Sequence, residues 1–254
     1  MKSLASFILI IGLLFTFSCE QMNSNDSAGH PSSEHAGEFY QLKTYIFDTD
    51  EQEQITDSYL KQAFLPGLKR LGINNIGVFK PRPETNSPKK IYVLIPFSSL
   101  AQFLNLEESL AQDETHMTAG AEYINAGYQS PPYKRLESTL MKAFEDMPFL
   151  QVPQLDSPRK DRIYELRSYE SPTELYHKKK VEMFNAGGEV KLFKSLDFNA
   201  VFYAAVISGS KMPNLMYMTT FANQASRDAH WDTFRKSPQW LKLKAVTKYL
   251  NSVS

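Results

Sequence analysis

Glu165, Arg167 and Tyr169 alternate along the stretch YELRSY and are the residues best suited to do chemistry in this chain. Alternate side chains of an extended strand share one face, so a carboxylate, a guanidinium and a phenol would lie together. A charged pair in an enclosed place is either mutually satisfied or serves a ligand. Two interpretations therefore stay open: a structural Glu165–Arg167 pair, or a polar pocket for a carboxylate or carbonyl ligand, which an arginine fork suits.

An earlier stretch of the chain repeats this pattern. FYQLKTY, residues 39 to 45, places Gln41, Lys43 and Tyr45 at the three corresponding positions. The apolar neighbours Tyr164 and Leu166 are expected beneath the helices, so both polar faces should point into the space between two sheets. All six polar residues are therefore candidate ligand-binding residues.

Histidines are the other candidates for acid–base chemistry. His177 follows closely after YELRSY, and a catalytic interpretation would need Glu165 or His177 as the general base. A lone histidine beside a lysine run is more often a surface residue, and His116 and His230 are weaker candidates still. No pair of histidines has the spacing of a helical metal site, so we predict no bound metal.

Strong catalytic motifs are absent from the sequence: it contains no G-x-S-x-G, Walker A, G-x-G-x-x-G or H-E-x-x-H. No cofactor is required by the residues present. The stretch HWDTFRKSPQW, residues 230 to 240, holds both tryptophans. Large aromatic residues at helical spacing are usually core, so we predict that Trp231, Phe234 and Trp240 seat the last helices on the sheet.

The elements that must position these residues occur twice. FYQLKTY matches IYELRSY at an offset of 124 residues, IYVLIPF (91–97) matches LMYMTTF (215–221) at the same offset, and NIGVF (75–79) matches FNAVF (198–202) at 123. Three matches at nearly one offset predict a duplicated unit. The two copies are expected at 38–158 and 160–254.

Strand and helix periodicities alternate in the same order in both copies. The first copy predicts a strand at 39–46, a helix at 51–71, strands at 75–80 and 90–97, and a helix at 99–118. The second predicts a strand at 162–169, a long helix, strands at 199–207 and 214–221, and a helix from about Ser226. This is the βαββα order of ferredoxin-like units. The fold class is therefore α+β, with the two sheets covering each other face to face.

The long helix of the second copy has three local signals. Ser171 is expected as its N-cap, with Pro172 in the first position and Glu174 three residues after the cap. Gly187-Gly188 predicts a kink or a close packing point. Lys178 to Lys180 are expected to face solvent.

YELRSY, the stretch GSKMPNLMYMTTFANQASRDAHW and the pattern W-x-x-F-R-x-x-P-x-W at 231–240 together resemble a NIPSNAP domain, of the dimeric α+β barrel superfamily. The resemblance covers about 162–244, and the first copy keeps only the topology. It implies one pseudo-dimeric barrel built from both units. The superfamily includes cofactor-free monooxygenases, haem-binding enzymes and small-molecule binders, so the resemblance implies a fold more than an activity. In haem-binding relatives a histidine such as His177 would be an axial ligand, which keeps haem as an option.

The first residues predict export. Lys2 precedes an apolar run from Leu4 to Phe17, too short for a spanning helix, so residues 1–18 are expected to be a signal peptide. Cys19, the only cysteine, stands where lipidation would occur, and residues 19–37 have the composition of a flexible tether. We expect a lipid-anchored protein of the cell envelope or periplasm; an ordinary cleaved signal is the alternative.

Composition limits the partners. Loss of Lys2 with the leader leaves 27 basic against 28 acidic residues, a net charge near −1 that gives no electrostatic case for nucleic acid. The membrane would be reached through the anchor, and self-association stays open.

The leading hypothesis is a lipoprotein that binds a small organic molecule between its sheets. The alternatives are a scaffold lipoprotein with a filled barrel and a cofactor-free, monooxygenase-like enzyme.

Overall fold

The computed structural model describes residues 37–83 and 88–253. The expected signal peptide, Cys19 and the tether up to residue 36 lie outside the described residues. The described residues form one compact unit. Among the described residues, no helix is both long and apolar enough to cross a membrane.

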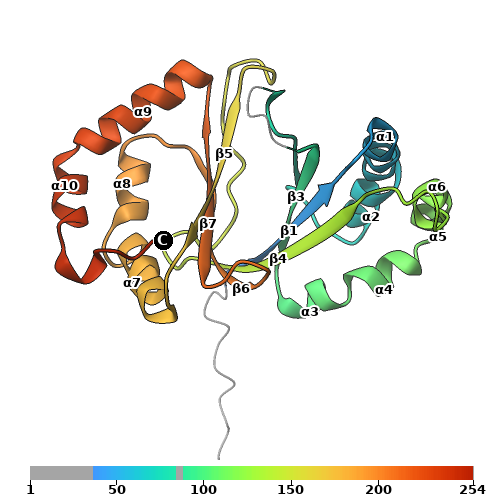
Figure 1. Ribbon diagram of the computed structural model, residues 1–254, viewed down its shortest axis with the longest axis horizontal. Coiled ribbons are helices and arrows are strands. Elements are labelled where there is room, and N and C mark those ends of the chain that lie inside the picture. The colour runs from blue at the N-terminus through green and yellow to red at the C-terminus, as the bar shows by residue number, and fades with distance from the viewer. Residues whose placement is uncertain (1–36, 84–87, 254) are drawn as a thin grey trace, which may run out of the picture. The chain divides into compact units, whose positions relative to one another are not determined.

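Seven strands form one antiparallel sheet in the order β2-β3-β1-β4-β6-β7-β5. The strands are β1 (Phe39–Ile46), β2 (Gly77–Phe79), β3 (Lys90–Phe97), β4 (Arg135–Ala143), β5 (Ile163–Glu170), β6 (Ala200–Ser208) and β7 (Asn214–Phe221). The sheet curls, with helices outside it on two sides (Figure 1). The α+β class predicted from the sequence is confirmed, and the two expected sheets are the halves of this one curled sheet.

Helices cover the outer face of each half (Figure 1). The first half carries α1 (Asp50–Tyr59), a π-helical turn (Leu60–Phe64), α2 (Leu65–Arg70), α3 (Leu100–Leu104), α4 (Leu106–Ala111), α5 (Glu114–Ala119) and α6 (Ala121–Ile124). The second half carries α7 (Glu174–Phe184), α8 (Glu189–Ser195), α9 (Gln224–Lys236), α10 (Pro238–Lys244) and a 3-10 turn (Thr247–Tyr249).

Strand boundaries and register repeat between the halves. β1 and β5 have the same length and start 124 residues apart, and so do β3 and β7. Phe39 lies opposite Phe97 in the first half, and Ile163 lies opposite Phe221 in the second. This agrees with the repeats seen in the sequence, while duplication of an ancestral unit stays a prediction.

The halves differ in their fourth strand. The first half is complete, in the ferredoxin-like order β2-β3-β1-β4, and β4 was not predicted from the sequence. The second half contributes β6-β7-β5, and β4 pairs with β6 to make the sheet continuous. β2 and β5 are therefore the two edge strands.

Three apolar clusters hold the unit together. Two lie between the sheet and the helices, one in each half. The third fills the inside of the curled sheet, and its buried members are Tyr40, Leu42, Leu94, Met141, Val201, Phe202, Ala204, Val206, Met216 and Met218. Both halves supply this inner cluster, so neither half buries its inner face alone.

The long helix predicted in the second half begins later than expected and is interrupted where expected. Thr173, in extended conformation, accepts a hydrogen bond from the backbone N–H of Tyr176 and is the N-cap, whereas Ser171 donates its hydroxyl to the carbonyl of Ser252. The prediction of Ser171 as the cap was wrong.

Gly187 and Gly188 separate α7 from α8. A Cβ at Gly187 would lie 2.5 Å from the carbonyl oxygen of Met183, and Gly188 has a φ of 87°, in the left-handed region that glycine favours. The predicted interruption is confirmed.

Candidate functional site

Glu165, Arg167 and Tyr169 lie on the face of β5 that the helices cover, and not on the inner face as the sequence suggested. Leu166 packs against the inner cluster, while Tyr169 packs against the cluster beneath the helices. The predicted orientation was wrong because the indole of Trp231 and the guanidinium of Arg227 on α9 satisfy the polar groups beneath that helix. The structure brings the three side chains together, as the spacing predicted.

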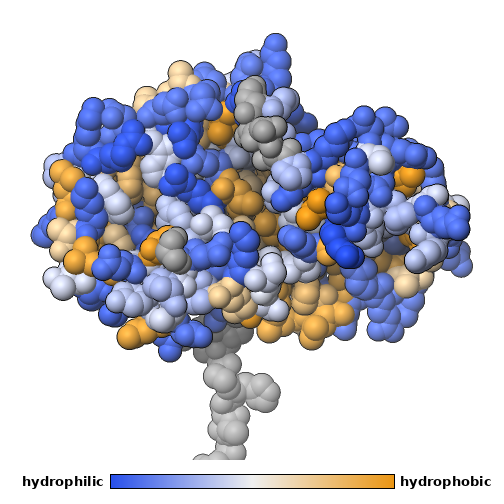
Figure 2. All heavy atoms as spheres, viewed as in Figure 1, coloured by the Kyte–Doolittle hydropathy of each residue, from blue (hydrophilic) through white to orange (hydrophobic). Residues whose placement is uncertain are grey.

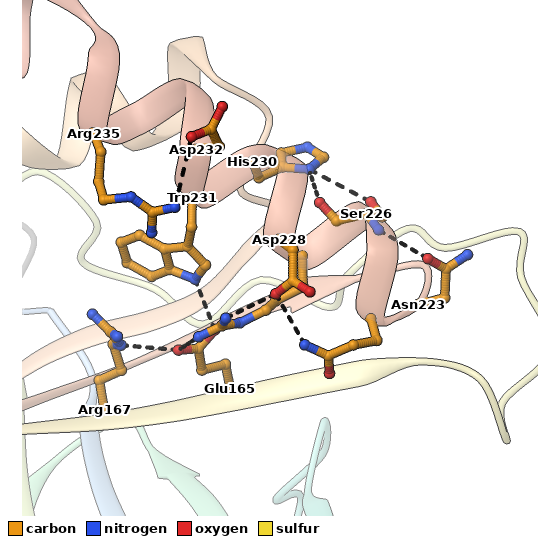
Figure 3. A network of polar contacts seen from close by, with 11 residues as sticks. Glu165, Arg167, Asn223, Ser226, Asp228, His230, Trp231, Asp232 and Arg235 are labelled. Carbon is orange, nitrogen blue, oxygen red and sulfur yellow. Dashed lines mark hydrogen bonds and ion pairs between the residues drawn. The ribbon is translucent and has the colours of Figure 1, made fainter.

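Glu165 is the centre of a polar network between β5 and α9 (Figure 3). Its carboxylate accepts hydrogen bonds from Arg227 Nε and Nη2 and from Trp231 Nε1, all at 2.8 Å, and from Arg167 Nε at 3.0 Å. Burial disfavours the charged carboxylate, but the donors from Arg227 and Trp231 outweigh this and lower the pKa of Glu165. The group is an ionised acceptor with its hydrogen-bonding capacity in use.

Arg167 lies between an aromatic ring and two phenols. Its guanidinium carbon lies 4.2 Å from the centre of the Trp231 ring, and its Nη1 donates to the hydroxyl of Tyr169 at 2.9 Å. The hydroxyls of Tyr169 and Tyr217 are 3.0 Å apart. Burial raises the pKa of the Tyr217 phenol well above its ordinary value, so Tyr217 is a neutral hydrogen-bonding group.

A second charged pair lies beneath the helices of the same half. Lys180 Nζ donates to Glu189 Oε2 at 3.0 Å, and the two side chains are 6% and 3% exposed. The expectation that the whole lysine run faces solvent was wrong for Lys180, because its ammonium group is also 4.8 Å from the ring of Phe184. Burial raises the pKa of Glu189 against the opposing attraction of Lys180. No sequence spacing marked this pair, which forms across the break at Gly187 and Gly188.

The first half has no equivalent network at Gln41, Lys43 and Tyr45. These side chains also face the helices: Lys43 Nζ donates to Glu107 at 3.0 Å, and Gln41 Nε2 donates to Ser138 at 2.8 Å. Tyr45 is buried in the helix-side cluster. Thus none of the six residues faces the inside of the curled sheet, and a ligand-binding role for them stays a prediction.

The three histidines lie apart from one another. His116 is buried, with Nε2 3.1 Å from the hydroxyl of Tyr59 and Nδ1 3.0 Å from the carbonyl of Leu110. His230 Nδ1 is 2.7 Å from the carbonyl of Ser226. His177 is half-buried, burial lowers its pKa, and its Nδ1 has no hydrogen-bond partner. Within the described segments, no three His, Cys, Asp or Glu side chains gather in a group that could hold a metal ion.

The aromatic residues of HWDTFRKSPQW form the packing core that the sequence predicted. Trp231 and Phe234 are buried, and the ring of Phe234 stacks on Phe193 of α8 with ring centres 4.8 Å apart. Ser237 is the N-cap of α10, and Trp240 of that helix packs on Phe234. Arg227 pairs with Glu165 across the space between α9 and β5.

A cavity lies where the two edge strands meet; we call it the seam cavity. Among the described strands, β2 pairs only with β3 and β5 only with β7. Side chains bridge the two edges, with the rings of Phe79 and Tyr164 5.1 Å apart. The cavity has a volume of about 610 Å³. Its described lining residues are Asn75, Ile76, Gly77, Val78, Phe79, Lys80, Arg82, Leu94, Leu150, Val152, Pro153, Arg159, Arg162, Ile163, Tyr164 and Val201.

The seam cavity has an apolar floor and a polar surround. In Figure 2, hydrophobic residues gather in a recess between β5 and the strands of the first half, and hydrophilic residues surround it. Leu94 and Val201, which line the cavity, also belong to the inner cluster. Sequence reasoning missed this site because it forms between two strand edges that are 84 residues or more apart, and no spacing motif marks such an encounter.

The single curled sheet with helices on its outer faces defines a two-unit α+β barrel. The NIPSNAP family model matches residues 164–254, which make up most of the second half of this barrel. The comparison with curated protein sequences found no match.

Two solved structures resemble the whole two-unit architecture. A candidate monooxygenase from Fusobacterium nucleatum subsp. nucleatum has a TM-score of 0.55 at 10% identity, over 87% of this chain and 89% of that one. A candidate monooxygenase from Lactobacillus acidophilus has a TM-score of 0.51 at 10% identity, over 82% of this chain and 85% of that one. At this identity the likeness concerns the fold alone.

Proposed function

We propose that this protein binds a small, largely apolar organic molecule in the seam cavity. The observation that carries the proposal is the cavity itself: its volume of about 610 Å³ lies in the range of ligand sites, roughly 300–1,000 Å³. Apolar side chains from both halves line it beside a few polar groups. A barrel that served only as a scaffold would gain packing by closing this space.

The cavity supports binding more than proton-transfer chemistry. Its described lining residues include no carboxylate and no histidine. Glu165 and His177, the general bases considered from the sequence, are not among them. The monooxygenase-like and scaffold alternatives are therefore less well supported than binding.

Fluorescence titration with N-phenyl-1-naphthylamine, a neutral aromatic probe, tests the proposal. We expect saturable binding that Leu150→Trp weakens at least tenfold, because Leu150 is half-buried at the cavity wall and an indole there would fill the space. Val152→Trp is a second variant at an exposed lining position, and Leu71→Trp, half-buried outside the cavity, is the matched control. Equal binding by wild type and both cavity variants would mean that the probe binds elsewhere and would overturn the proposal.

We further propose that the protein is exported and lipid-anchored at Cys19, with the membrane reached through the anchor. The support is the sequence of residues 1–19, with its lysine, apolar run and single cysteine. In cells that process such leaders, Cys19→Ser should move the protein from the membrane fraction to the soluble fraction. An unchanged membrane fraction in the variant would contradict the anchor.

A further inference from the structure

The wall of the seam cavity is cationic over the part that the structure describes. Its charged lining residues are Lys80, Arg82, Arg159 and Arg162, and the described lining includes no acidic side chain. Lys80 is balanced locally, because it forms ion pairs with Glu53 and Asp57 of α1. Arg159 and Arg162 lie in the loop before β5.

Arg162 is held in place by neutral groups. Its Nε donates to the carbonyl of Ser157 at 2.8 Å and its Nη2 to the carbonyl of Leu155 at 2.6 Å, and the side chain is half-buried. A guanidinium has five N–H donors, so three remain for another acceptor. Two backbone carbonyls fix the orientation of the fork but do not neutralise its charge.

No carboxylate in the described part of the chain forms an ion pair with Arg162 or Arg159. Asp156 and Asp161 belong to the same loop, but both are exposed and neither lines the cavity. An oriented, unneutralised guanidinium beside an apolar space is suited to an organic anion, since arginine forks match carboxylate and related groups.

We propose that the seam cavity selects an apolar organic anion, whose hydrocarbon body lies against Leu94 and Val201 and whose anionic group is bound by Arg162. This inference rests on the proposed function and names the ligand class of the same cavity. Arg159, exposed at the cavity wall three residues before, adds positive charge to the entrance. The carboxylate of an aliphatic acid and that of an aromatic acid share this recognition chemistry.

The test compares 8-anilinonaphthalene-1-sulfonate with N-phenyl-1-naphthylamine, which is the same ring system without the sulfonate. We expect the wild-type protein to bind the anion at least tenfold more tightly, equivalent to about 1.4 kcal/mol. Arg162→Gln should remove this preference and leave the neutral probe bound. Arg235→Gln, an equal loss of charge at an exposed position of α9, is the matched control. Circular dichroism checks that each variant is folded.

Two further measurements keep the inference testable if Arg162→Gln does not fold. Arg159→Gln, at an exposed position, should weaken binding of the anionic probe severalfold without changing binding of the neutral probe. Displacement of the bound sulfonate by dodecanoate or by 1-naphthoate would support the inference and show whether the cavity prefers an aliphatic or an aromatic acid.

The outcomes separate the two proposals. Equal binding of both probes, or displacement by neither acid, would overturn the anion inference while leaving the cavity proposal standing. If neither probe binds the wild-type protein, the proposed function itself is wrong.

Discussion

Glu165 accepts hydrogen bonds from Arg167, Arg227 and Trp231, and those from Arg227 and Trp231 connect the first strand of the second half to α9. The Glu165 side chain is 14% exposed, so losing its partners would leave charge in a poorly solvated place. This arrangement favours the structural interpretation of the Glu165–Arg167 pair. The carboxylate contributes to stability by holding the helix on the strand.

Glu165→Gln should lower the free energy of unfolding by about 2 kcal/mol at pH 7, because the charged acceptor of several hydrogen bonds is lost. The folded-state pKa of Glu165 is lowered from an ordinary value of about 4.5. Its contribution is therefore complete above that value and is lost as the pH falls through the folded-state pKa. Urea unfolding at pH 7 and at about pH 3 checks this. The difference in free energy of unfolding between wild type and variant should be smaller at about pH 3 than at pH 7.

Glu145→Gln, at an exposed position, is the control and should shift stability by less than about 0.5 kcal/mol. Binding of N-phenyl-1-naphthylamine should be unchanged in Glu165→Gln, because Glu165 does not line the seam cavity. If Glu165→Gln were as stable as wild type but no longer bound the probe, the ligand-binding interpretation of this residue would instead be supported.

At the scale of elements, periodicity predicted most strands but not the face that each one buries. β3 and β7 lie at the predicted residues, and β5 starts one residue later than expected. An alternating strand has two faces, and YELRSY has apolar or aromatic residues on both. Only the partners supplied by α9, 62 and 66 residues further on, decide that Glu165 faces the helices.

β4 escaped prediction for a related reason. Its sequence RLESTLMKA is mostly exposed or half-buried, and only Met141 is fully buried, so it lacks the alternation of a strand with one buried face. Its pairing with β1 and β6 comes from long-range contacts. The seam cavity could not be predicted either, because it also depends on which strands pair over long range. β2 has three residues whereas its counterpart β6 has nine, and no described strand pairs with the outer edge of β5.

At the scale of the whole molecule, the inner cluster makes the two halves depend on each other. Tyr40 and Leu42 come from the first half and Val201 and Phe202 from the second, and all four are buried in one cluster. β4 and β6 also join the halves by backbone hydrogen bonds. Unfolding one half would expose the inner face of the other, so the described part of the chain should unfold as one cooperative unit.

Leu68→Ala tests this dependence. Leu68 is fully buried beneath the helices of the first half, and its truncation should cost about 3 kcal/mol. Both tryptophans lie in α9 and α10 of the second half, so their fluorescence reports that half alone. We expect the urea midpoint followed by tryptophan fluorescence to fall as far as the midpoint followed by far-UV circular dichroism. Leu104→Ala, at a leucine that is 73% exposed, should shift neither. A fluorescence midpoint that stays at the wild-type value while circular dichroism shows an earlier transition would mean that the halves fold independently, despite sharing the inner cluster.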